Sequence, residues 1–166
     1  MAAFQTHERE PHNPLDRVER VAARRDWVLD RSDDDEVTLL VSSSFSDLHV
    51  ALNWRADLET LHVAASFDMK VPGPRRDEAS RLIALINEQL MHGHFDLWRS
   101  DGSIVFRNNL VLAGGAEAND AQCEMLIRLA ADNCQRYFPA VQFVVWAGRK
   151  AEDAIESSLF ETMGEA

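Results

Sequence analysis

The segment from Leu82 to Trp98 constrains the fold more than any other part of the chain. Its first part repeats apolar residues at helical spacing as far as Gly93, and an alternation of apolar and polar residues starts directly after that glycine. Glycine often follows the last turn of a helix because it tolerates a left-handed backbone conformation. We therefore predict a helix that ends at Gly93 and leads at once into a strand, so the fold must contain both kinds of element.

Alternation elsewhere in the chain predicts an antiparallel sheet. The candidate strands are five alternating runs, at residues 37–41, 48–54, 61–67, 95–99 and 104–112. Short polar breaks between such runs are typical of antiparallel strands that bury one face. Before these runs, residues 27–29 form a short extended piece, and residues 32–35 (SDDD) are predicted to form a solvated, acidic hairpin turn.

Three amphipathic helices complete the predicted architecture, at residues 14–25, 74–93 and 120–137. We expect Pro139 to interrupt the last of them, because proline removes a helical hydrogen bond. The predicted order is α-β-β-β-α-β-β-α, which makes an α+β two-layer sandwich of an antiparallel sheet with helices. The expected domain organisation is a mobile N-terminal segment at residues 1–12, a single domain at 13–160 and a C-terminal tail at 161–166.

Composition argues against some classes of binding partner and indicates a cellular compartment. The chain has 28 acidic and 17 basic side chains, a net charge of −11. Because each phosphate contact needs a cation, this balance argues against nucleic-acid binding. No apolar run reaches the length of a membrane span or of a signal-peptide core, so we expect a cytoplasmic protein that does not bind membranes. Cys123 and Cys134 lie on one predicted helix, too far apart to form a disulfide, and we expect both to be buried and reduced.

His49 and His62 are the first candidates for a binding site. A two-residue hairpin at Arg55 and Ala56 would place the two imidazoles opposite each other on the face of the sheet that turns away from the core. Such a pair could begin a zinc site, but zinc requires three or four ligands and this face adds only displaced aspartates. The alternative is a solvated histidine pair, and we expect neither a metal nor a cofactor.

His94, Asp96 and Trp98 share one side of a predicted strand. An imidazole beside a carboxylate could perform acid–base chemistry if a cleft enclosed them, but the sequence shows neither a cleft nor a nucleophile motif. An exposed tryptophan on a sheet is a suitable interface anchor, whereas a covering C-terminal helix would make the same ring part of the core. Both interpretations of Trp98 remain open. Asn87, beside the apolar stripe of its helix, could cap a strand edge or meet a partner.

Several blocks of the chain resemble the bacterial YbjN family of sensory-transduction regulators. They are residues 84–90 (ALINEQL), 93–98 (GHFDLW), 114–118 (GGAEA) and 137–148 (YFPAVQFVVWAG). The resemblance implies a fold similar to that of type III secretion chaperones, and a regulatory or chaperone-like protein without catalytic residues. It supplies no functional residue that can be transferred to a position of this chain.

The leading hypothesis is a non-enzymatic protein-binding module, with homodimerisation as a further expectation. Its expected contacts are Trp98, His49, His62 and Asp96, together with the acidic C-terminal residues. The second hypothesis is a small-molecule sensor or enzyme with a pocket between the sheet and the long helix near the C-terminus. In that case His94 and Asp96 would supply the polar groups of the pocket.

Overall fold

The computed structural model describes residues 12–163. The predicted mobile segment 1–12 lies almost wholly outside this range, and residues 161–163 of the predicted tail form the end of the last helix. The helices are α1 (Leu15–Arg24), α2 (Arg76–Asn87), α3 (Asp120–Val145) and α4 (Ala151–Met163). The strands are β1 (Val28–Asp33), β2 (Glu36–Val41), β3 (Leu48–Arg55), β4 (Thr60–Lys70), β5 (His94–Leu97) and β6 (Ser103–Val111). None of the helices in this part of the chain is long and apolar enough to cross a membrane.

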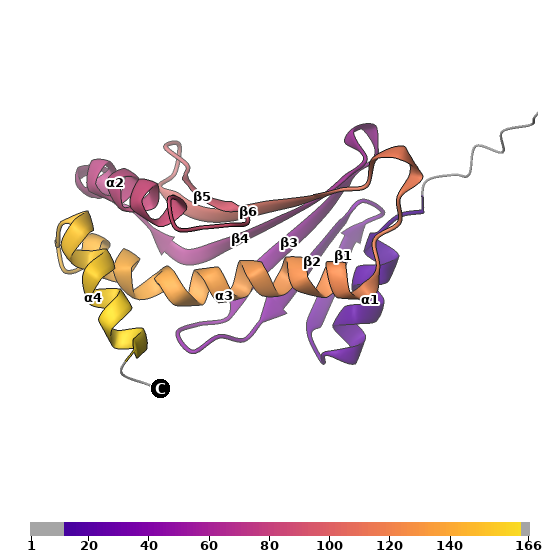
Figure 1. The fold of residues 1–166 in the computed structure, drawn as a ribbon, viewed down its shortest axis with the longest axis horizontal. Coiled ribbons are helices and arrows are strands. Elements are labelled where there is room, and N and C mark those ends of the chain that lie inside the picture. Colours follow the sequence, from indigo (N-terminus) through magenta and orange to yellow (C-terminus); the bar gives the residue numbers. More distant parts are fainter. Residues whose placement is uncertain (1–11, 164–166) are drawn as a thin grey trace, which may run out of the picture.

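The six strands form one antiparallel sheet in the order β1-β2-β3-β4-β6-β5. Residues of β2, β3 and β4 alternate between buried and more exposed, so one face of the sheet forms the core. Figure 1 shows α3 lying across the sheet, with α1 near one end of it and α2 and α4 near the other. The predicted α+β architecture of an antiparallel sheet layered with helices is confirmed.

The order of elements differs from the prediction by one strand, β1, and one helix, α4. Residues 28–33 form β1, which pairs with β2 and makes the acidic turn a hairpin as predicted. β1 is an edge strand with one side open to solvent, so it can carry the charged residues Asp30 and Arg31. Their charges interrupt the apolar alternation from which a strand is predicted. Arg31 donates to the Asp16 carboxylate at 2.9 Å, and Asp33 Oδ1 accepts from the Asp35 amide at 2.8 Å, so α1 and the turn hold the strand in place.

The interruption predicted at Pro139 is wrong. Helix α3 runs without a break from Asp120 to Val145, although Pro139 cannot donate a backbone hydrogen bond. Tyr137 and Ala140 are buried on either side of the proline, and this packing against the same core offsets the loss of one bond. Beyond α3, residues 151–163 form a separate helix, α4, which packs on α3 and α2.

One hydrophobic core joins the helices to the sheet. Its largest buried side chains are Tyr137, Phe95 and Phe106, from α3, β5 and β6. Helix α3 begins at a capping box in which Asn119 and Gln122 each accept from the other's backbone amide at 2.8 Å. Phe95 attaches the short strand β5 to this core, because its ring packs against Phe106 of β6 and Tyr137 of α3.

Candidate functional site on the open face of the sheet

The side of the sheet that turns away from the core carries the predicted site residues. We call this surface the open face; it includes Thr38, His49, Ala51, Asn53, His62, Ala64, Ser66, His94, Asp96, Val105, Arg107 and Asn109. The strand pairing aligns these residues in rows across the sheet, and most of them are partly exposed or exposed. Small side chains such as Ala51 and Ala64 lie in the middle of the face, so the polar groups around them are accessible.

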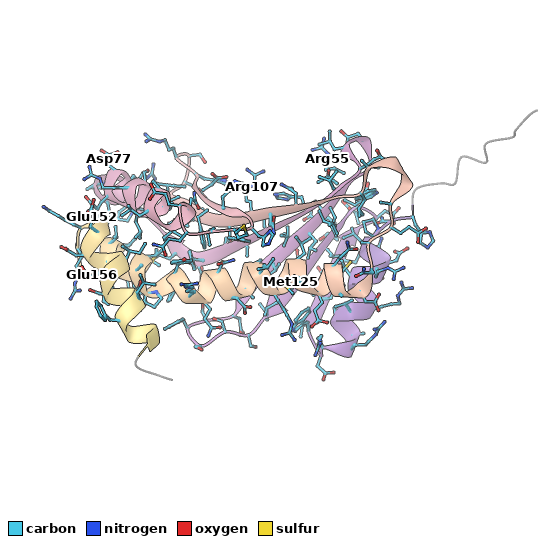
Figure 2. The ribbon with its side chains drawn as sticks, viewed as in Figure 1. Arg55, Asp77, Arg107, Met125, Glu152 and Glu156 are labelled. Atoms are coloured by element: carbon cyan, nitrogen blue, oxygen red, sulfur yellow. The ribbon has the colours of Figure 1, made fainter. Side chains whose placement is uncertain are left out.

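Arg107, which is labelled in Figure 2, brings three of these residues into one network. Its Nε donates to His62 Nε2 at 3.2 Å, and its Nη1 donates to Asp96 Oδ2 at 3.2 Å. His94 Nε2 lies 3.3 Å from the same Asp96 oxygen. We call His62, His94, Asp96 and Arg107 the polar network. Its cationic centre makes it a poor metal site, because the guanidinium occupies the histidine nitrogen that a metal would need.

The pKa of His62 is lowered from its ordinary value of 6.5. Partial burial is the main cause, since it disfavours the charged imidazolium, and the charge of Arg107 and the proximity of His94 act in the same direction. His62 is therefore neutral at physiological pH, in agreement with its role as the acceptor of the Arg107 hydrogen bond. The network thus keeps one fixed arrangement of donors and acceptors near pH 7.

Lowering the pH is expected to destabilise the folded protein through His62. Below about pH 6.5 the unfolded chain binds a proton at His62 that the folded protein binds less readily, so the free energy of unfolding falls as the pH falls. Urea denaturation at about pH 7.5 and about pH 5.5 measures this loss. The variant His62→Gln should show a smaller loss between the two values, whereas an identical pH dependence in both proteins would contradict this role of His62.

The predicted pairing of His49 with His62 is wrong. His49 pairs with Ser66, and His62 pairs with Asn53, four positions along β3 from His49. The reason is the loop between the strands, where residues 56–58 form a 3-10 turn and Glu59 adopts φ 47°, instead of the two-residue turn that the prediction assumed. The two imidazoles share the open face but lie roughly 13 Å apart along the strands. The described residues contain no group of three metal-ligating side chains.

Trp98 lies beyond the end of β5, where its backbone amide donates to the Ser103 carbonyl at 2.8 Å. Its side chain is 49% exposed, so the interpretation of this ring as a core residue is wrong. One of the two interpretations required a covering C-terminal helix, but helix α4 packs on α2 and α3. Trp98 directly follows β5, two residues after Asp96 of the polar network.

Asn87 anchors the strand that carries these residues. Its side chain accepts from the Phe95 amide at 2.8 Å and donates to the Phe95 carbonyl at 3.0 Å. The side chain thus replaces a neighbouring strand on the outer edge of β5, which confirms the edge-capping interpretation of this residue. In consequence α2 fixes the position of His94 and Asp96 relative to β6.

The remaining candidates for chemistry do not assemble. Cys123 and Cys134 are buried and free, and burial raises their thiol pKa to about 11 and about 12, so neither is a reactive thiolate near pH 7. A cavity of about 360 Å³ does lie between the sheet and α3, but its lining includes neither His94 nor Asp96. The second hypothesis therefore named the wrong residues for this cavity.

Arg107 is the residue of the network that the sequence did not reveal. It lies on the predicted strand 104–112, on the side opposite the core, where a charged residue is ordinary. Only the register of β6 between β4 and β5 places it opposite both Ala64 and His94, within reach of His62 and Asp96. A sequence gives no direct signal for register across strands that are far apart in the chain.

Comparisons with known proteins agree with this fold. The profile of the YbjN family, described as "Putative bacterial sensory transduction regulator", matches residues 14–143. No curated protein sequence matches the chain. Among solved structures, "Crystal structure of YbjN, a putative transcription regulator from E. coli" is similar with a TM-score of 0.53 and 10% identity, covering 89% of this chain and 93% of the other. A chain of "Crystal Structure of the ExsC-ExsE Complex" is similar with a TM-score of 0.49 and 18% identity, covering 76% of this chain and 94% of the other. Because the family profile spans most of the folded region, the chain is a member of the YbjN family.

Proposed function

We propose that the protein is a non-enzymatic regulatory module that binds another protein through the open face. The observation that carries this proposal is the exposed Trp98 next to the ordered polar network. Tryptophan and arginine are the side chains most enriched at the energetic centres of protein interfaces; here Arg107 stands on β6, and Trp98 directly follows the edge strand β5. Trp98, His49, His62 and Asp96 are the proposed contacts, and Arg107 joins them.

The chemistry of the network supports binding better than catalysis. Arg107 holds the Asp96 carboxylate, and the same carboxylate faces His94, so the charged groups are engaged with one another. General acid–base catalysis needs a group aimed at a substrate in a site that excludes water. The network instead lies on a partly exposed surface, where preordered donors and acceptors favour selective contact with a protein.

The family description supports a regulatory role in bacteria, and the proposal extends it to a cytoplasmic protein that needs no cofactor. A homodimer is a compatible arrangement, since a sheet face used by one partner leaves α4 and the other end of the molecule available. The acidic residues of α4, among them Glu152 and Glu156 in Figure 2, are then a secondary contact for a basic partner.

Replacing Trp98 with alanine is expected to weaken partner binding about 30-fold, the equivalent of about 2 kcal/mol, with little change in stability. The measurement is affinity capture from the native lysate with wild-type protein and the variant, followed by titration of the recovered partner. Leu58→Ala is the matched control, because Leu58 is 59% exposed but lies in the loop after β3. A partner that binds Trp98→Ala as tightly as wild type, or that loses as much affinity with Leu58→Ala, would refute the open face as the binding surface.

A further inference from the structure

Strand β6 is longer than its edge neighbour β5. The pairing of β5 with β6 ends at His94 and Arg107, whereas β6 continues to Val111 beside β4. Among residues 12–163, no strand pairs with residues 108–111 on the β5 side. Gly93, directly before β5, has φ 71°, and the strand pairing with β6 does not extend beyond His94 to residues 108–111.

The backbone groups of Asn109 and Val111 point out from this free edge. Asn87 binds both backbone groups of Phe95, so those groups point away from β6, and the hydrogen-bonded pairs between the two strands involve alternate, odd-numbered residues of β6. The hydrogen bond of Ser103 fits this alternation, because the carbonyl of this odd-numbered residue accepts from the Trp98 amide on the β5 side. The hydrogen bond of the even-numbered Leu112 fits it as well, because the Leu112 amide donates to the Glu59 carbonyl on the opposite, β4 side.

The Asn108 side chain already imitates a neighbouring strand at this edge. Its Oδ1 accepts from the Asn109 amide at 2.9 Å, the position that a carbonyl of an added strand would take. A side-chain amide held by one local bond is easily exchanged for a backbone carbonyl, since both are neutral acceptors of similar strength. The edge is therefore protected by a group that can be displaced.

An apolar groove lies directly beside the free edge. This is the cavity of about 360 Å³ between β6 and α3, lined by His92, Asn108, Asn109, Leu110, Asn119, Ala121, Gln122, Met125, Leu126 and Leu129. Met125 on α3 is 56% exposed, and Figure 2 shows it on the long helix. We call the free edge 108–111 and this groove together the β6 slot.

We propose that the β6 slot binds an extended segment of a partner protein as an additional strand. The segment would pair with Asn109 and Val111, and every second side chain would enter the groove against Leu110, Met125 and Leu129, so it must be apolar at alternate positions. The chain carries a net charge of −11, so basic residues at the other positions complement its overall charge. This inference rests on the proposed protein-binding function but assigns it a second surface with a defined chemistry.

The test uses the full-length protein and a short capped peptide of alternating leucine and lysine. Binding is followed by backbone amide NMR shifts, which should change at Asn109 and Val111 and along the Met125 side of α3. Three control peptides should each bind at least about tenfold more weakly. The first has the same composition with its leucines in one block, the second is methylated at the backbone nitrogens, and the third has glutamate in place of lysine. Equal binding of the methylated peptide would overturn the proposal, because strand pairing needs those N–H groups.

Two pairs of protein variants locate the peptide. Val111→Pro removes the outward N–H of a residue whose side chain is 64% exposed, and Val111→Ala retains it; proline is tolerated at such an edge. Met125→Glu places a charge in the groove wall, and Met125→Leu keeps the wall apolar. We expect about tenfold or more weaker binding with Val111→Pro and with Met125→Glu, and near wild-type binding with the two controls. If Val111→Pro fails to fold, the comparison of Met125→Glu with Met125→Leu still tests the proposal.

Three other outcomes would overturn the proposal. The first is that no peptide binding is observed at about 1 mM peptide. The second is that the free edge pairs with a second copy of this chain in a concentration-dependent manner. The third is that the peptide binds only after residues 1–11 are removed. Trp98→Ala should bind the peptide as wild type does, since Trp98 lies outside the slot. The peptide measurements therefore test the slot, and the capture measurements with Trp98→Ala test the open face separately.

Discussion

Replacing Phe95 with alanine is expected to lower the free energy of unfolding by about 3–5 kcal/mol, because the change leaves a large cavity in the core. Phe95 is 2% exposed, and its ring packs against Phe67, Phe106 and Tyr137 with centroid distances of 6.1, 5.2 and 6.0 Å. These contacts connect β5 with β4, β6 and α3. Urea denaturation of wild type and variant, followed by circular dichroism, gives the difference.

Phe45→Ala is the matched control for this prediction. Phe45 also contacts an aromatic ring, that of Phe138 at 5.2 Å, but it is exposed and lies in the loop before β3. Its replacement should cost about 1 kcal/mol. A loss for Phe95→Ala no greater than that for Phe45→Ala would contradict the central position of Phe95 in the core.

Replacing Gly93 with alanine is expected to lower the free energy of unfolding by about 3 kcal/mol or more, for two reasons that add. Gly93 has φ 71°, a left-handed conformation that costs energy for a residue with a side chain. An added Cβ would also lie 2.4 Å from a Phe106 ring carbon and 2.7 Å from the Arg107 carbonyl oxygen, so the backbone would have to move. Thermal and urea denaturation measure the loss.

Gly114→Ala separates the two causes. Gly114 has φ 73°, almost the same as Gly93, but nothing lies within 4 Å of its Cβ position. This control should therefore show the conformational cost alone, about 1 kcal/mol. Equal losses at the two glycines would show that the close approach of Gly93 to β6 contributes nothing.

Both substitutions act on the strand that carries the proposed binding surface. β5 has four residues, and it is held by Phe95 in the core, by Asn87 on its outer edge and by Gly93 at its start. His94 and Asp96 can meet Arg107 only while β5 stays paired with β6. Destabilised variants should therefore lose partner binding along with stability, which is why Trp98→Ala, with its exposed side chain, is the sharper functional test.

Patterns within one element were predictable from the sequence, because they depend on local periodicity. The alternating runs at 48–54 and 61–67 correctly predicted β3 and β4, and the side chains of their apolar faces, including that of Trp54, are buried. Asn87 was recognised as a polar residue beside an apolar stripe, with edge capping as one of its two interpretations. Only residues 27–29 were predicted to be extended there, because the charged residues of β1 give no apolar alternation; in the fold, Arg31 pairs with Asp16 and Glu19.

Relations between elements were not predictable in the same way. The register of His49 and His62 depends on a loop in which Glu59 takes a left-handed conformation, and no glycine or asparagine signals this turn. The sequence left open whether Trp98 is exposed or covered, and the structure leaves it 49% exposed, with α4 packed on α2 and α3. The β6 slot depends on the different lengths of two paired strands and on the distance between β6 and α3, neither of which leaves a local pattern.

The central claim is that a partner protein contacts the open face, and photo-crosslinking inside living cells tests it most directly. A photoreactive amino acid is placed at Trp98 in one protein and at Leu58 in another, since both positions are exposed and lie in different parts of the surface. The account predicts a specific crosslinked partner from position 98 and none from position 58. Crosslinks of equal yield from both positions, or a partner captured only from position 58, would contradict it.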